Sequence, residues 1–326
     1  MRTTVLIPLH HAAQWEEALR EQLVELQGVA RVIVSDATGG DATLDALRAS
    51  ADGPSIDWVG PRALSPGWVA HANDLQSRAT TEFVMWLPHD DRITQAWIRE
   101  AEAHLDIEPE AVAACGPIEP LSLDSRGRGA AIDVPSFMTM RDPVDRVTAA
   151  VDRLIIGQSS ELGLLFRSVV RRSAAPPLPP GIVGDEWSDL LWSLRLLSRG
   201  PVAPISAHYA KRWHDHNTHG GWGDHATDYP ELVRAAVSLA IEELGSGNRA
   251  SVLTRAWVAE VLRDREELQR REEYWQAVHA ALWRDVKRSA SWRLTAPARA
   301  AASALRALFT RGPRPDSPPE RPGAPQ

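Results

Sequence analysis

Two adjacent carboxylates that follow a short apolar run are the residues best suited to chemistry in this chain. Asp90 and Asp91 follow Pro88-His89 at the end of Phe83–Leu87, which has the length and composition of a buried strand. In a parallel α/β sheet, ligands bind just beyond the carboxyl ends of the strands. Paired acids at such an end suit Mg²⁺ or Mn²⁺, because hard cations take oxygen ligands and accompany substrate phosphates. The alternative is that one acid only caps the helix expected over Thr94–Leu105.

Asp36 holds a similar place after a second expected strand, Arg31–Ser35. A carboxylate there can accept hydrogen bonds from a ribose or base, although an aspartate before Thr-Gly-Gly is also a common turn residue. If the strands are parallel, Asp36 and Asp90 lie on one edge of the sheet. The first expected strand, Thr4–Leu9, is not followed by a glycine-rich phosphate loop, which disfavours dinucleotide-binding and P-loop folds. The sequence therefore favours a nucleotide whose phosphates are held through a metal.

A third acidic group lies at the start of the helix expected over Glu186–Arg199 and consists of Asp185, Glu186 and Asp189. Acids at this end of a helix interact favourably with its dipole, which is a sufficient structural explanation. Asp185 and Asp189 are four residues apart and share a helix face. At a pocket, one of the three acids would serve as a general base on a hydroxyl group.

Histidines gather in the segment that follows, at positions 208, 214, 216, 219 and 225. His-x-His spacing is compatible with metal binding, but histidines in a Gly- and Asn-rich loop are often only polar loop residues. One histidine joining a carboxylate-bound cation is favoured over a separate zinc site.

Strands and helices alternate over the first hundred residues, which predicts a mostly parallel sheet with helices on both faces. The further elements expected there are helices over Gln14–Leu26, Ala42–Ala49 and Gly67–Arg78 and a strand over Ile56–Val59. Later segments read as a helix over Pro143–Ile156, a last strand over Val202–Tyr209, and helices over Glu231–Leu244, Ser251–Leu262 and Arg263–Arg288. This organisation predicts an α/β domain over 1–225, a helical extension over 226–310 and a disordered Pro-rich tail over 311–326.

Composition excludes several classes of protein. With 36 Lys and Arg against 43 Asp and Glu, the net charge of -7 gives no basic surface for nucleic acid. The single cysteine, Cys115, excludes an internal disulfide framework, fits the cytoplasm and is expected to be a small core residue. No stretch approaches the roughly 18–20 apolar residues of a membrane span.

Taken together, these segments resemble the family-2 glycosyltransferases of the inverting type over about residues 3–220. The resemblance lies in Thr4–Leu9, the loop after Asp36, the Ala70–Asp74 helix and the Phe83–Asp91 strand, where Pro88 replaces the first acid of the family motif. Counting back from Arg195 and Gly200 matches Asp189 to the catalytic base of the family, whereas Asp185-Glu186-Trp187 matches its Glu-Asp-Trp and would select Glu186. Arg212-Trp213-His214 is similar to its Arg-x-His.

The resemblance implies an α/β fold of the GT-A type, a Rossmann-like nucleotide-diphospho-sugar transferase domain followed by a helical extension. It implies transfer of a sugar from a nucleotide-diphospho-sugar to an acceptor hydroxyl, by single displacement with inversion. The acceptor would be a surface polysaccharide or a lipid-linked glycan, met in the cytoplasm or at the inner face of the membrane. The residues implied are Pro8, His10, Asp36, Asn73 and Asp90 for the donor, Asp90, Asp91 and His214 for Mg²⁺ or Mn²⁺, and Asp189 as base with Glu186 and Asp185 as rivals.

Three alternatives stay open. Because Pro88 replaces an acid, a degenerate transferase that only binds a sugar nucleotide or glycan is the alternative outside enzymes. A sugar-phosphate nucleotidyltransferase would share the sheet but normally needs a glycine-rich phosphate loop after the first strand. A metallohydrolase built on the histidine loop would carry zinc.

Overall fold

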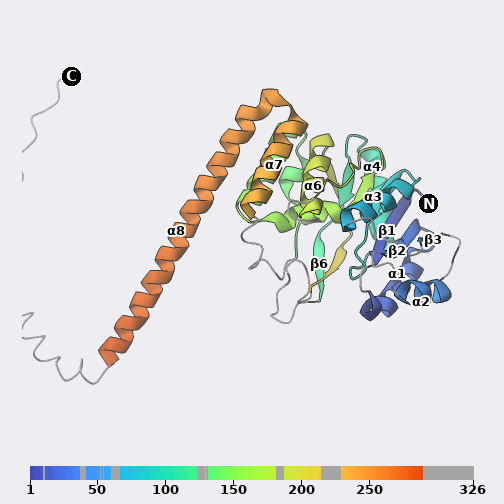
Figure 1. The fold of residues 1–326 in the computed structure, drawn as a ribbon, viewed down its shortest axis with the longest axis horizontal. Coiled ribbons are helices and arrows are strands. Elements are labelled where there is room, and N and C mark those ends of the chain that lie inside the picture. The colour runs from blue at the N-terminus through green and yellow to red at the C-terminus, as the bar shows by residue number, and fades with distance from the viewer. Residues whose placement is uncertain are drawn as a thin grey trace, which may run out of the picture. The chain divides into compact units, whose positions relative to one another are not determined.

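The computed structural model describes residues 1–9, 12–36, 42–51, 53, 55–59, 67–122, 129, 131–180, 187–213 and 229–288. Its centre is a seven-stranded sheet in the order β3-β2-β1-β4-β7-β5-β8. The first four strands in this order are mutually parallel, which confirms the mostly parallel sheet (Figure 1). Their bounds are β3 Ile56–Val59, β2 Ala30–Asp36, β1 Thr3–Leu9 and β4 Phe83–Trp86.

The central strands form because their apolar runs are buried on both faces. Val5, Leu6 and Ile7 of β1 are fully buried, and β4 is buried along its whole length. Continuous apolar strands of this kind are typical of sheets covered by helices on both sides. The covering helices in this half are α1 Glu16–Leu26, preceded by the short 3₁₀ helix η1 Ala13–Trp15, α2 Ala42–Ser50, α3 Trp68–Arg78 and α4 Gln95–Ile107.

The far half of the sheet was only partly predicted. The strand β7, Val169–Arg171, pairs antiparallel with both β4 and β5, and it follows the 3₁₀ helix η3, Ser159–Arg167. Neither element was predicted, because β7 has three residues and η3 lacks a clear period. The outer strands are β5 Ala113–Cys115 and β8 Val202–Pro204.

A second sheet of two parallel strands pairs β6, Ile118–Ser122, with β9, Tyr209–Arg212. The single strand predicted over Val202–Tyr209 is wrong, since a bend separates β8 from β9. The small sheet brings β9 against the end of β4, because the backbones of Arg92 and Ala210 exchange two hydrogen bonds of 2.8 and 3.0 Å.

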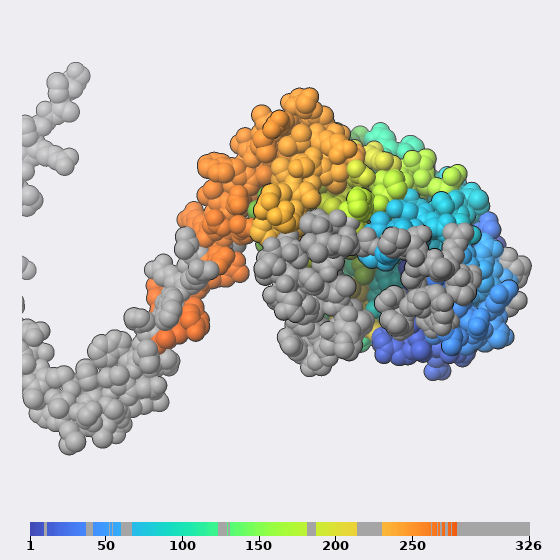
Figure 2. Space-filling model, viewed as in Figure 1, coloured from blue at the N-terminus to red at the C-terminus, as the bar shows by residue number. Residues whose placement is uncertain are grey.

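The helices α5, Pro143–Ile155, α6, Ser188–Arg199, and α7, Tyr229–Leu244, pack on one another. The helix α5 begins at Asp142, whose side chain accepts hydrogen bonds from the backbone N–H groups of Val144 and Asp145. The space-filling view shows the orange surface of α7 and the start of α8 beside the green and yellow surface of the preceding segments (Figure 2). A compact unit therefore runs from Met1 to Arg263, beyond the boundary expected after residue 225.

The last helix, α8, runs without a break over Arg249–Arg288, so the predicted helical residues are confirmed but form one helix rather than two. No Gly or Pro interrupts the sequence at Leu262-Arg263, and the charged residues that follow are good helix formers. The remaining described 3₁₀ helices are η2 Ser136–Thr139 and η5 Ser246–Asn248. None of the helices in the described ranges is both long and apolar enough to span a membrane.

Cys115 is a small core residue, as expected. It is fully buried in β5, and burial raises the pKa of its thiol to about 12, which leaves it protonated and unreactive at neutral pH.

Candidate active site

Polar side chains from four separate elements meet beyond the end of β4. We call them the polar cluster: Asp90, Asp91, Arg167, Asp189, Tyr209 and Lys211. Asp90 and Asp91 follow β4, Arg167 ends η3, Asp189 opens α6, and Tyr209 and Lys211 belong to β9. The structure thus brings together the two acidic groups that the sequence singled out, although about a hundred residues separate them.

Asp91 is almost completely enclosed, with a side chain only 1% exposed. Its Oδ2 accepts hydrogen bonds from Nε of Arg167 at 3.0 Å and from the hydroxyl of Tyr209 at 2.9 Å. Its Oδ1 accepts from the backbone N–H of Arg212 at 3.0 Å. Both carboxylate oxygens of Asp91 thus accept hydrogen bonds from protein donors, and its metal-binding role stays a prediction.

Arg167 connects the two acidic groups. Besides its ion pair with Asp91, it lies near enough to Asp189 for each to shift the pKa of the other. Burial alone would lower the pKa of Arg167, but the charge of Asp91 raises it above its usual value, so the guanidinium stays charged. Sequence patterns did not identify Arg167 or Tyr209, since only the tertiary fold brings them to Asp91.

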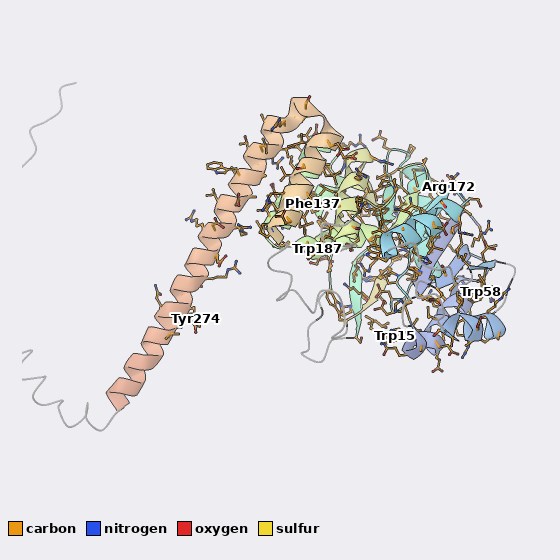
Figure 3. All side chains as sticks on the ribbon, viewed as in Figure 1. Trp15, Trp58, Phe137, Arg172, Trp187 and Tyr274 are labelled. Carbon is orange, nitrogen blue, oxygen red and sulfur yellow. The ribbon has the colours of Figure 1, made fainter. Side chains whose placement is uncertain are left out.

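Asp189 is the one candidate base among the described residues. It lies in the first turn of α6, and partial burial raises the pKa of its carboxyl group, opposed by the charge of Arg167. The helix is entered through Trp187, whose φ of 65° makes it the one non-glycine residue with positive φ in the described chain (Figure 3). Left-handed backbone at a bulky residue is costly and often accompanies functional sites. Asp185 and Glu186, the rival bases, lie outside the described residues.

Asp36 and Pro8, which are predicted to bind a donor, lie on the same edge of the sheet as the polar cluster. Asp36, buried at the end of β2, is opposite Leu9 in the parallel register of β1 and β2, and Pro8 is opposite Ser35. The carbonyl of Pro8 also lies 3.4 Å from Nδ1 of His89, which ties the end of β1 to the loop after β4. His10 lies outside the described residues.

An arginine and a tryptophan stack close to this edge. The guanidinium of Arg212 lies 4.6 Å from the ring centre of Trp15, at the start of α1 (Figure 3). Nε of Arg212 lies 3.4 Å from the carbonyl oxygen of Asp90. His214, predicted to assist the metal, lies outside the described residues.

Asn73 has a use that the sequence did not indicate. Its Nδ2 donates to the carbonyl of Leu178 at 3.0 Å, and its Oδ1 accepts from the backbone N–H of Leu178 at 2.7 Å. The amide therefore fixes the proline loop before α6, which leaves it poorly placed to contact a donor nucleotide.

A divalent cation fits the site with a reduced set of ligands. Among the described residues, no three His, Cys, Asp or Glu side chains are grouped closely enough to form a metal site on their own. Asp90 is half-buried and adjoins the cluster, so it remains the candidate carboxylate ligand. Mg²⁺ commonly binds one or two carboxylates together with waters and substrate phosphates, so a single aspartate is compatible with it.

Comparisons with known proteins bear on the fold. No family model and no curated protein matches the sequence. The structure is similar to S. aureus TarS 1-349 in complex with UDP-GlcNAc, with a TM-score of 0.59 and 16% identity over 79% of this chain and 72% of that one. TarS 1-349 without a named ligand gives a TM-score of 0.57 and 15% identity over 79% and 71%. The mannosyltransferase PcManGT from Pyrobaculum calidifontis, in complex with GDP-Man and Mn²⁺, gives 0.47 and 15% over 95% and 88%.

The likeness to the two TarS structures, with the sheet order and its covering helices, shows that the chain has the GT-A fold. The fold expected from the sequence is confirmed. The fold alone does not establish the function, because many unrelated functions share one fold.

Proposed function

We propose that this protein is a glycosyltransferase that moves a sugar from a nucleotide-diphospho-sugar to an acceptor hydroxyl. One observation carries the proposal: Asp90 beyond β4 and Asp189 at the start of α6 belong to a single polar cluster, at the carboxyl edge of a GT-A sheet. Such an edge is where ligands of open α/β sheets bind. Family-2 membership and inversion are part of the proposal.

Each described residue has a stated part in the reaction. Asp36 accepts hydrogen bonds from the ribose or base, and Asp90 ligates Mg²⁺ or Mn²⁺. A cation held there supplies Lewis-acid neutralisation of the leaving diphosphate. Asp189 takes the proton of the acceptor hydroxyl, whose oxygen attacks the anomeric carbon from the face opposite the diphosphate. Its raised pKa, caused by burial, makes Asp189 a stronger base than an exposed aspartate.

Asp91 and Arg167 position these groups. Arg167 is held by Asp91 and lies near enough to Asp189 to lower its pKa, and Tyr209 donates to the same Oδ2 of Asp91. The acceptor is proposed to be a glycan or lipid-linked glycan, reached in the cytoplasm or at the inner face of a membrane.

A donor screen tests the proposal. Purified protein is heated with UDP-, GDP- and dTDP-sugars, beginning with UDP-GlcNAc, the ligand of the TarS structure, with and without Mn²⁺. A true donor raises the Tm, because it binds only the native state. Each stabilising donor is then incubated with Mn²⁺, and release of nucleoside diphosphate is followed by chromatography. The absence of any stabilisation by these donors, with or without Mn²⁺, would reject the proposal.

A second function is favoured by Pro88 and the commitment of Asp91 to protein donors. Pro88 removes one acid of the family motif, and both oxygens of Asp91 accept hydrogen bonds from protein donors. A protein that binds sugar nucleotides without transferring them would show the same stabilisation. It would release no nucleoside diphosphate with any acceptor or with water, and this outcome separates the two functions.

A further inference from the structure

Lysine is scarce in this chain, and one of its two lysines lies in the polar cluster. Lys211 and Lys287 are the two, among 36 basic residues that are otherwise arginine. Lys211 lies on β9 and is only 7% exposed. Because side chains alternate along a strand, Lys211 projects from the same face of β9 as Tyr209, whose hydroxyl donates to Asp91.

Among the described residues, no carboxylate lies within 4.0 Å of the ammonium group of Lys211 to form an ion pair. Its Nζ lies 4.0 Å from the ring centre of Trp213, a cation–π contact. Burial lowers its pKa to about 8. A buried charge is expensive unless it is paired, so the fold retains a cation that a bound anion would stabilise.

The charged groups near Lys211 indicate which part of the site such an anion would occupy. The pKa of Lys211 responds to Asp90 and Asp91 beyond β4, to Asp189 on α6 and to Arg167 on η3. The ammonium is thus near enough to the candidate metal ligand and to the candidate base for their charges to raise its pKa. In the proposed reaction, the diphosphate lies near the same two groups.

Because the family motif has lost one acid here, a second positive group would help to neutralise the diphosphate. Pro88 supplies no carboxylate, and both oxygens of Asp91 accept from protein donors, so the protein would hold a metal less firmly than a motif of three acids would. A loosely held cation leaves more of the diphosphate charge for the protein to neutralise. An ammonium group is a compact point charge that binds phosphate well.

We propose that Lys211 binds the diphosphate of the donor directly and gives the protein an affinity for nucleoside diphosphates that does not need a metal. This inference deepens the proposed function and rests on it. The alternatives are that Lys211 only supports Trp213 or that it binds a phosphate of the acceptor.

Calorimetric titration distinguishes these readings. UDP and GDP, uridine and guanosine, and inorganic pyrophosphate are titrated in EDTA into wild-type protein and into the variants Lys211→Met, Lys211→Arg and Lys287→Met. The nucleoside diphosphate that binds wild type should bind Lys211→Met about 10- to 100-fold more weakly, since one charged hydrogen bond is lost. Nucleoside binding should not change, Lys211→Arg should recover part of the loss, and Lys287→Met should match wild type.

Amine labelling gives a second measurement that needs no variant. Wild-type protein in EDTA is acetylated with a lysine-selective ester at pH 8, and modification of Lys211 and Lys287 is compared by mass spectrometry. The nucleoside diphosphate should protect Lys211 but not Lys287, and inorganic phosphate at the same concentration should protect weakly.

The outcomes separate the two proposals. Equal nucleoside diphosphate affinities of wild type and Lys211→Met, or equal protection by phosphate and nucleoside diphosphate, overturn the role of Lys211 and leave the glycosyltransferase proposal standing. A parallel loss of nucleoside and nucleoside diphosphate binding in Lys211→Met indicates a structural role and also overturns it. Wild-type protein that binds no nucleoside diphosphate with or without Mn²⁺ overturns both.

Discussion

The hydroxyl of Tyr209 donates a hydrogen bond of 2.9 Å to Oδ2 of Asp91, joining residues 118 positions apart. This bond links the two-stranded sheet to the end of β4. Because Arg167 and the backbone of Arg212 donate to the same carboxylate, Asp91 holds three separate segments together. Asp91 therefore holds the surrounding segments in place, whereas its neighbour Asp90 is the proposed metal ligand.

Replacing Asp91 by alanine should destabilise the fold by about 3–5 kcal/mol, because it leaves the buried guanidinium of Arg167 without its carboxylate. Asp90→Ala should change the free energy of unfolding by less than about 1 kcal/mol, since Asp90 is half-buried and its neighbour keeps the buried pair. Urea unfolding followed by circular dichroism measures both. Similar losses in the two variants would contradict the division of roles.

Asn73→Ala should cost about 1–3 kcal/mol, because the N–H and C=O groups of buried Leu178 lose their partners. The variant should still bind the donor, since the amide supports the proline loop rather than the nucleotide. Urea unfolding measures the loss, and calorimetric titration with the donor found in the screen measures the affinity. If Asn73 contacts the nucleotide instead, affinity will fall at nearly unchanged stability.

Local sequence signals predicted much of the first half of the fold. The strand over Ile56–Val59 has the predicted bounds, and α5 ends within one residue of its predicted end, since each has a clear period and strong boundary residues. The strand β7 was missed because its place between β4 and β5 depends on partners distant in sequence.

The sequence indicated where the candidate site lies, but it did not show how Asp90 and Asp91 differ in their contacts. Asp90 and Asp91 are chemically identical neighbours, and only the fold shows that Asp91 is enclosed by Arg167 and Tyr209. Lys211 and Arg167 belong to no motif, because their function depends on a charge environment assembled from four elements. A sequence pattern contains that information only through the tertiary structure.

Removal of the metal should abolish transfer without unfolding the protein. In excess EDTA, the rate with the identified donor should fall by at least about 100-fold, because Lewis-acid stabilisation is worth several kcal/mol in the transition state. Adding Mn²⁺ or Mg²⁺ back should restore it. Asp90→Ala should resemble the EDTA-treated enzyme and should not recover when metal is added. Full activity in EDTA would remove the metal from the mechanism.

Asp189→Asn should lose transfer activity and gain stability at neutral pH. Loss of a general base lowers the rate by about 10²- to 10⁴-fold. Burial raises the folded-state pKa of Asp189 above its unfolded value, so the folded protein binds a proton more readily than the unfolded chain. Ionised Asp189 therefore lowers stability at pH 7, and this penalty disappears as the pH falls through the folded-state pKa.

The asparagine variant avoids that penalty at every pH. Its Tm should exceed that of wild type at pH 7, and the difference should shrink as the pH falls. Thermal unfolding of both proteins between about pH 4 and pH 8 measures this, with Ser193→Ala on the same helix as a control whose Tm difference from wild type should not follow this pH trend. A variant that is inactive but less stable than wild type at pH 7 would show that Asp189 is held by compensating contacts, and the role of base would then rest on the rate alone.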